Sequence, residues 1–177
     1  MPPTPGSAPG ADADTVVPLA RMPRAERAFV LAPDAEARQQ VADALGIEAI
    51  RKLRFEGRLV PDGARDWRLE ATLGATAVQA CVVTLAPVTT RVDADVVRRY
   101  LADWVEPEAE EAEMPEDETQ EALPDRLDLA VVMREALALS LPDYPRAEGA
   151  ELSEATFAGP GVQPMTDDDA RPLAGLA

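Results

Sequence analysis

Hydrophobic and charged residues alternate through the middle of the chain, from Ile50 to Trp104. In the first stretch the apolar positions are Leu53, Phe55 and Leu59, and the charged positions between them are Lys52, Arg54, Glu56 and Arg58. A period of two places alternate side chains on opposite faces of a strand, so this stretch predicts a half-buried antiparallel strand. Pro61-Asp-Gly then predicts a turn.

Two further stretches continue the pattern, from about Asp66 to Leu85 and over residues 90–101. Gly74 stands where the alternation of the second stretch ends, which predicts a bulge or bend that keeps the later apolar residues facing inward. The third stretch changes phase at Val96-Val97-Arg98-Arg99. Because short turns join consecutive strands, the default topology is an antiparallel meander.

Two helices and a short strand complete the expected fold. Residues 27–32 form an apolar run that predicts a first strand, and residues 35–45 show helical spacing that ends at Gly46. Either Asp34 caps this helix or Pro33 occupies its first turn. A second helix is expected over residues 128–140, with Asp128 as N-cap and Leu141-Pro142 as its end. The predicted fold class is α+β: three long strands and a short N-terminal strand in a meander, packed with two helices.

The ends of the chain and one internal segment lack this periodicity. Residues 1–24 are expected to be a disordered tail, residues 25–149 a single domain, and residues 150–177 a flexible tail. Within the domain, residues 106–121 form a run rich in Glu and broken by Pro. Like charges at this density repel one another, so the run predicts a disordered acidic loop.

Charge divides the chain into two parts. Residues 1–105 hold 13 Lys and Arg against 14 Asp and Glu, whereas residues 106–177 hold 4 against 19. The net charge of −16 therefore belongs to the C-terminal part, and the strands keep most of the cations. Uniform acidity would argue against DNA or RNA binding, because binding to phosphates needs a local positive potential. The segregation of charge weakens this objection to RNA binding without removing it.

The composition also indicates the cellular compartment. A single cysteine fits a reducing environment, and no run approaches the roughly 18 apolar residues of a membrane helix. The first ten residues have neither a basic start nor an apolar core, so they do not resemble a secretory signal. We expect a cytoplasmic protein with no membrane partner.

Few residues of the chain offer catalytic chemistry. There is no histidine, and one cysteine cannot build a cysteine-based zinc site within one chain. Asp167-Asp-Asp169 lies in the expected tail without a glycine-containing calcium loop, and Cys81 has no basic neighbour in the sequence. We expect Cys81 to be a small buried residue and predict no catalytic, metal or cofactor site. An enzyme using carboxylates alone would need two converging acids, which the sequence does not indicate.

A group of cations forms the candidate RNA or partner face. Its members are Lys52, Arg54, Arg58, Arg68, Arg98 and Arg99. Such a stripe is typical of a surface for RNA phosphates or for an acidic protein. The alternative is an ordinary solvent face balanced by Glu56, Glu70, Asp93 and Asp95 through cross-strand pairs. No aromatic residue interleaves with the cations, so base stacking has no support.

Two motifs resemble those of the YceD family, whose members are linked to accumulation of large-subunit ribosomal RNA. Cys81-Val-Val-Thr-Leu85-Ala-Pro87 is similar to the family's Cys-x-Arg-Cys-Leu-x-Pro. The second motif is similar to the family's helix running into Leu-Pro-x-x-Pro, and its residues here are Leu127, Asp128, Leu129, Glu135, Leu141, Pro142 and Pro145. The resemblance covers about residues 25–150.

The chain departs from the family pattern at three places. Val83 replaces the usual arginine, Thr84 replaces the second cysteine, and Ala147 stands near a position where many members have histidine. A metal or redox role based on Cys-x-x-Cys therefore does not carry over to this chain.

The resemblance implies a non-enzymatic factor in large ribosomal subunit biogenesis, with a ribosomal precursor or a basic ribosomal protein as partner. Direct contact with RNA is left open. The acidic part of the chain would attract a basic protein and repel bare RNA, which favours the protein partner. The alternative is a general acidic adaptor or chaperone-like module unrelated to ribosomes.

Overall fold

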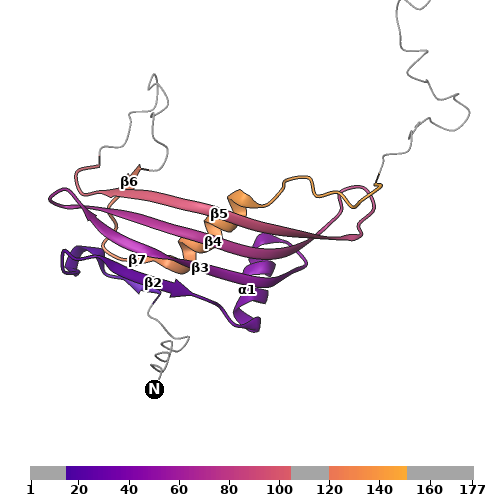
Figure 1. Ribbon diagram of the computed structural model, residues 1–177, viewed down its shortest axis with the longest axis horizontal. Coiled ribbons are helices and arrows are strands. Elements are labelled where there is room, and N and C mark those ends of the chain that lie inside the picture. The colour runs from indigo at the N-terminus through magenta and orange to yellow at the C-terminus, as the bar shows by residue number, and fades with distance from the viewer. Residues whose placement is uncertain (1–14, 105–119, 151–177) are drawn as a thin grey trace, which may run out of the picture.

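The computed structural model describes residues 15–104 and 120–150, which form a twisted five-stranded sheet, a separate two-stranded sheet and helices packed against the larger one (Figure 1). The α+β meander predicted from the sequence is confirmed. Its elements are β1 (Val16–Val17), the 3-10 helix η1 (Leu19–Arg21), β2 (Arg27–Leu31), α1 (Ala35–Leu45), β3 (Ala49–Asp62), β4 (Asp66–Ala80), β5 (Pro87–Leu101), β6 (Gln120–Ala122), β7 (Leu127–Asp128) and α2 (Leu129–Ser140).

The main sheet has the strand order β2-β3-β4-β5-β6. The first four strands are joined antiparallel in chain order, and β6 returns to lie parallel to the end of β5. The turn between β3 and β4 contains Gly63, whose φ of 54° suits glycine better than any residue with a Cβ. Alternation along the long strands gives the sheet an inner face that carries the core and an outer face that carries the charges.

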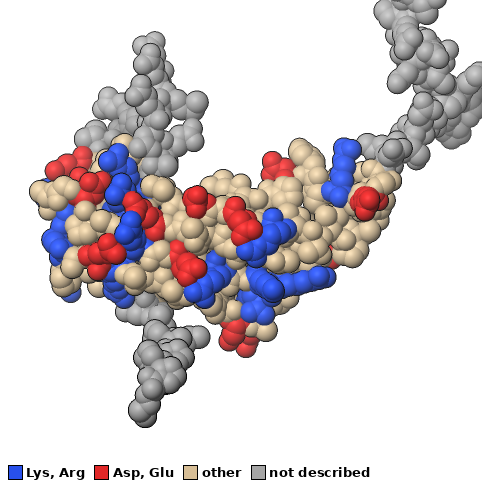
Figure 2. Space-filling view, viewed as in Figure 1, with Lys and Arg blue, Asp and Glu red and all other residues tan. Residues whose placement is uncertain are grey.

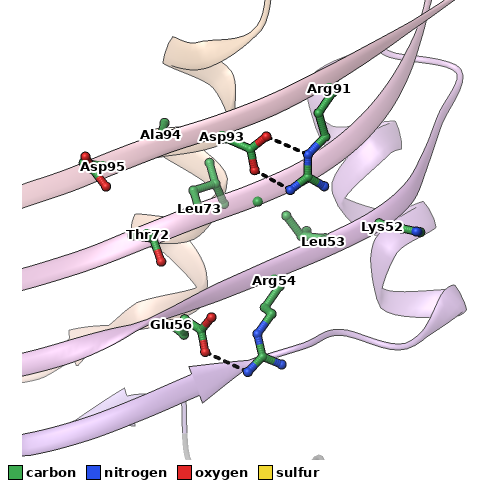
Figure 3. Close-up of a pocket in the computed structure, with 11 residues that line it drawn as sticks. Lys52, Leu53, Arg54, Glu56, Thr72, Leu73, Arg91, Asp93, Ala94 and Asp95 are labelled. Atoms are coloured by element: carbon green, nitrogen blue, oxygen red, sulfur yellow. Dashed lines mark hydrogen bonds and ion pairs between the residues drawn. The ribbon is translucent and has the colours of Figure 1, made fainter.

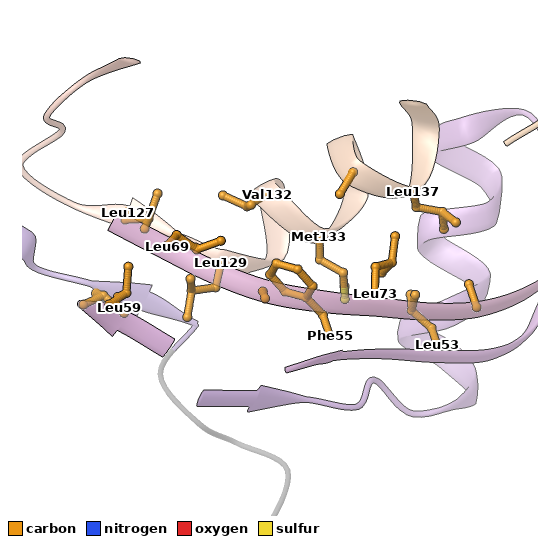
Figure 4. Packing of buried hydrophobic residues seen from close by; sticks show 14 of the residues in the cluster. Leu53, Phe55, Leu59, Leu69, Leu73, Leu127, Leu129, Val132, Met133 and Leu137 are labelled. Carbon is orange, nitrogen blue, oxygen red and sulfur yellow. The ribbon is translucent and has the colours of Figure 1, made fainter. Parts of the chain in front are cut away.

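The core lies between the inner face and the helices, as Figure 4 shows for α2. Phe55, Leu59 and Leu69 are fully buried from the sheet side, and Val132 and Leu137 meet them from α2. Asp128 caps α2 by accepting a hydrogen bond from the Ala130 N–H at 2.9 Å. Of the two alternatives for α1, the Asp34 cap is the correct one, since its side chain accepts from the Ala37 N–H at 2.8 Å.

The prediction of a disordered tail up to residue 24 is wrong for its described part, residues 15–24. β1 pairs with β7 next to α2, and Val17 and Leu19 are buried in the core. Arg24 donates to the backbone oxygens of Asp66 and Gly63 and lies 4.8 Å from the centre of the Trp67 ring. These contacts join segments that are far apart in the sequence, so local periodicity does not predict them. Residues 1–14 and 151–177, the rest of the expected tails, lie outside the described residues.

Three other expectations about the strands need correction. Residues 120 and 121 of the expected acidic loop belong to β6, while 105–119 lie outside the described residues. No bulge occurs at Gly74, where β4 alternates without interruption; the register shift lies in β3, between Ile50 and Lys52. β4 ends at Ala80 rather than Leu85, and β5 keeps its alternation through residues 96–99.

Candidate functional site

The outer face of the sheet gathers five of the six predicted cations. Lys52, Arg54 and Arg58 stand on β3, with Arg68 on β4 and Arg99 on β5. Arg68 and Arg99 are direct neighbours in the β4–β5 register. Figure 2 shows basic and acidic side chains interleaved on the surface rather than a continuous basic stripe.

Carboxylates neutralise most of these cations. The pairs are Arg54–Glu56 at 2.7 Å, Arg58–Glu70 at 2.8 Å, Arg68–Glu70 at 3.0 Å, Arg99–Asp62 at 3.4 Å, and Arg91–Asp93. The hydrogen bond to Glu56 raises the pKa of Arg54, and the same bond lowers the pKa of Glu56. Exposed pairs of this kind contribute little to stability, so their main effect is on the charge of the surface. A phosphate approaching this face would compete with a carboxylate for nearly every guanidinium.

Two open depressions mark the outer face. The first has a volume of about 560 Å³ and lies over β3, β4 and β5, with Arg54–Glu56 and Arg91–Asp93 on opposite sides of it (Figure 3). The second, of about 710 Å³, extends toward β2 and includes the exposed Val30 and Val97. Among residues 15–104 and 120–150 no group of three or more Cys, Asp or Glu is arranged to hold a metal ion. The predicted Asp167-Asp-Asp169 cluster lies outside these ranges.

Arg98 does not belong to the candidate face. It lies on the inner side of β5, where its guanidinium contacts Glu121 of β6 at 3.0 Å and Glu135 of α2 at 2.8 Å. Its side chain is 15% exposed. Burial by itself would lower the pKa of Arg98, but the hydrogen bond to Glu135 and the charge of Glu121 raise it overall. Arg98 therefore connects β5, β6 and α2 instead of offering a charge to a partner.

Beside this cluster lies Tyr100, whose side chain is buried next to Arg98. Burial raises the pKa of the Tyr100 hydroxyl, and the charge of Glu121 adds to the effect. The hydroxyl therefore stays protonated over the whole physiological pH range.

The two motifs meet at one end of the sheet. After β4 the chain turns through residues 81–86, and the sulfur of Cys81 accepts N–H bonds from Val83 and Thr84, both at 3.4 Å. It also accepts the N–H of Ala147, 66 residues away, at 3.3 Å. We call the turn 81–86 together with residues 141–150 the motif junction.

Two further hydrogen bonds hold the junction together. The Val82 N–H donates to the Pro145 carbonyl at 3.0 Å, and the Gln79 side-chain amide donates to the Pro142 carbonyl at 3.2 Å. The proline rings fix φ at Pro142 and Pro145, which restricts the backbone conformations open to this segment. The three-residue spacing of Pro142 and Pro145 therefore places both carbonyls within hydrogen-bond distance of Gln79 and Val82.

The junction exposes large apolar side chains. Val82 is 48% exposed, Leu85 76% and Tyr144 78%. Leu85 has a φ of 60°, a left-handed conformation that costs a leucine about 1–2 kcal/mol. Strained residues of this kind tend to occur at binding sites, and exposed apolar side chains suit contact with another protein.

The remaining motif residues support the fold. Pro87 opens β5 opposite Ala80, Asp128 caps α2, and Leu129 is the buried first residue of that helix. Leu141 is partly buried against the core. The sequence did not indicate the role of Glu121, because Arg98 was expected on the other face.

Cys81 is expected to titrate as an acid of unusual strength. The hydrogen bond with the Thr84 hydroxyl, followed by the N–H groups of Ala147 and Thr84, lowers its pKa from 9.0 to about 6. A group whose pKa is lower in the folded than in the unfolded state adds stability as pH rises from about 6 to 9, and this contribution is lost as pH falls through about 6. Thiolate absorbance at 240 nm during a pH titration measures the pKa directly, since the chain has one cysteine.

The control is Cys81→Ser, which lacks the thiolate signal. Because Cys81 is 0% exposed, alkylation by iodoacetamide should stay slow even where the thiolate dominates. A midpoint near 9, as for an ordinary thiol, would contradict the prediction.

The described fold is of the α+β class, with helices on one face of the sheet, a charge-balanced outer face and a junction of two motifs. The model of the family described as large ribosomal RNA subunit accumulation protein YceD matches residues 69–177. The chain belongs to the YceD family. The match begins within β4 and includes both motifs. Comparison with curated proteins and with solved structures gave no match. No helix in the described ranges is long and apolar enough to span a membrane.

Proposed function

We propose that the protein is a cytoplasmic, non-enzymatic factor in large ribosomal subunit biogenesis. It supports the synthesis, processing or stability of large-subunit ribosomal RNA by binding a ribosomal protein or an assembling particle. The family description supports the general role.

We favour a protein contact over direct RNA binding because the outer-face arginines are paired with carboxylates. RNA affinity depends on releasing counterions from phosphates, and that requires cations with a net positive field around them. Here Arg54, Arg58 and Arg68 all have a carboxylate within 3.0 Å. The motif junction adds Val82, Leu85 and Tyr144, whose exposed apolar area suits a protein surface.

A basic ribosomal protein is the partner that the charge distribution favours. Residues 106–177 carry a net charge of −15, and this field accelerates encounter with a basic molecule and slows encounter with RNA. The hypothesis concerns attraction at long range; we assign the specific contacts to residues 15–104 and 120–150.

The test is recovery of the tagged protein from lysate separated on a sucrose gradient, with RNA and proteins identified in each fraction. Co-migration with immature large subunits supports action on the particle. Recovery at the top of the gradient with one basic ribosomal protein supports a holding role before assembly. Recovery with neither would contradict the proposal and favour the general adaptor.

Neutralising the acidic run is expected to weaken binding to a basic ribosomal protein by about tenfold at low salt, because electrostatic steering changes association rates by about 10–10³. The variant replaces Glu by Gln and Asp by Asn at Glu106, Glu108, Glu110, Glu111, Glu113, Glu116, Asp117 and Glu118. Glu121 is left intact because it contacts Arg98. Affinity is measured at two salt concentrations for the partner recovered from the gradient.

The matched control neutralises Glu151, Glu154 and the three aspartates at 167–169, which are acidic but lie elsewhere in the sequence. Equal affinities for the parent protein and the variant of residues 106–118 would show that the run does not attract the partner.

A further inference from the structure

β5 has a long edge that is open along most of its length. β6 pairs with it only at Arg99, Tyr100 and Leu101 (Figure 1). Over residues 87–98, β4 is its sole strand partner among the residues that the structure describes. At about 3.3 Å per residue, this edge is roughly 40 Å long. Alternate residues along it direct N–H and C=O groups away from the sheet.

The edge is regular enough to accept another strand. The β4–β5 register runs from Trp67–Tyr100 to Ala80–Pro87 without a shift. Proteins usually protect an edge with bulges, prolines, short strands or charged side chains. Between Val88 and Arg98 β5 has no bulge or proline, and its charged residues there are Arg91, Asp93 and Asp95 on the outer face. Strand addition to such an edge is a common way to bind an extended peptide.

Side chains along the edge indicate what such a strand would carry. On the inner side Val92, Ala94 and Val96 are buried or partly buried against the core. On the outer side Asp93 is paired with Arg91, whereas Asp95 is exposed and has no ion pair within residues 15–104 and 120–150. A strand added to β5 would bind most favourably with apolar side chains next to the inner residues and a basic side chain next to Asp95.

We propose that the open edge of β5 binds an extended basic polypeptide segment by strand addition. The proposal rests on the proposed function, since it names how a basic protein partner would be held. A second copy of the chain is a poorer occupant, because two molecules of charge −16 repel one another.

The test uses the full-length protein and a ten-residue peptide of alternating lysine and valine, labelled for fluorescence anisotropy. Binding is expected, together with slower hydrogen exchange of alternate amides within residues 88–98. Two further peptides carry N-methyl groups on all lysines or on all valines, which removes the donors of one edge each. One of these two should lose binding, because a single edge of the peptide pairs with β5. Equal binding of all three peptides would mean simple electrostatic attraction and would overturn the proposal.

A charge reversal on the protein provides the second arm. Asp95→Lys should weaken binding of the parent peptide about tenfold, since it replaces a favourable cross-strand pair with a repulsive one. Glu36→Lys makes the same charge change at an exposed position of α1 and should alter affinity less than about twofold. Equal losses in the two variants would overturn the proposal. So would binding that leaves β5 amides unprotected.

The two proposals fail separately. If the protein co-migrates with immature large subunits while the peptide does not protect β5, strand addition is wrong and the ribosomal role stands. If the peptide protects β5 while the gradient shows neither ribosomal particles nor ribosomal proteins, the edge binds basic segments and the ribosomal role is wrong.

Discussion

Replacing Leu137 by alanine is expected to lower the free energy of unfolding by about 2–5 kcal/mol, the range for removing a large aliphatic side chain from a core. Leu137 is 0% exposed and lies on the side of α2 that faces the sheet (Figure 4). Its loss leaves a cavity between the helix and the inner face. Urea unfolding, followed by fluorescence of the buried Trp67, measures the change.

Leu139→Ala is the matched control, because Leu139 lies two residues further along the same helix and is 84% exposed. We expect a change within about 0.5 kcal/mol. If the two variants unfolded at the same urea concentration, α2 would not be packed on the sheet as described. Because α2 carries Glu135 to Arg98 and leads into the motif junction, the Leu137→Ala change should also disturb these contacts.

Replacing Gly57 by alanine is expected to destabilise the protein by about 1–3 kcal/mol through overpacking. A Cβ at this position would lie 2.2 Å from the Glu70 carbonyl oxygen and 2.5 Å from the Ala71 Cα. These are backbone atoms of β4, so the strands themselves would have to move apart. Alanine also reduces the entropy of the unfolded chain, which offsets about 0.4–1 kcal/mol of the loss.

Gly74→Ala provides the comparison within the same sheet. Its Cβ would come closest to a terminal nitrogen of the Arg91 guanidinium, at 3.0 Å, and that flexible group can shift. The entropy gain is the same as at Gly57, so we expect little net change in unfolding free energy. Equal destabilisation of the two variants, measured by urea unfolding, would contradict the close approach of β3 and β4 at Gly57.

The local sequence pattern predicted the structure correctly wherever the spacing of apolar residues determines which side chains are buried. The alternation of Leu53, Phe55 and Leu59 predicted the inner face of β3. Asp128 predicted the beginning of α2, and Pro33-Asp34 predicted the beginning of α1 with two alternatives for its cap. These features depend on side chains a few residues apart, so the sequence carries them directly.

The same reasoning failed where distant segments decide the outcome. Two adjacent arginines suggested a change of phase in β5, because a cation was expected to face solvent. Arg98 instead keeps the alternation and points inward, since Glu121 and Glu135 supply its counter-charges. Gly74 suggested a bulge for a similar local reason, yet the strand continues through it because β3 and β5 both hold its register.

For the motif junction, the sequence identified Cys81, Pro142 and Pro145 as a set without indicating what unites them. The answer lies in backbone groups: the Ala147 N–H reaches the sulfur, and the Pro145 carbonyl receives the Val82 N–H. Donors and acceptors of the main chain are the same at every residue, so no residue type marks their positions.

By itself, the sequence determined the fold class, the order of strands β2 to β5 and of helices α1 and α2, and the concentration of negative charge after residue 105. Period and composition are local properties, and they are sufficient for these conclusions. Only the tertiary structure decided that the outer-face arginines are neutralised, that Arg98 faces α2, and that β5 keeps an open edge. Each of these depends on which residue stands across a strand or beneath a helix, and those neighbours are set by the packing of the whole sheet.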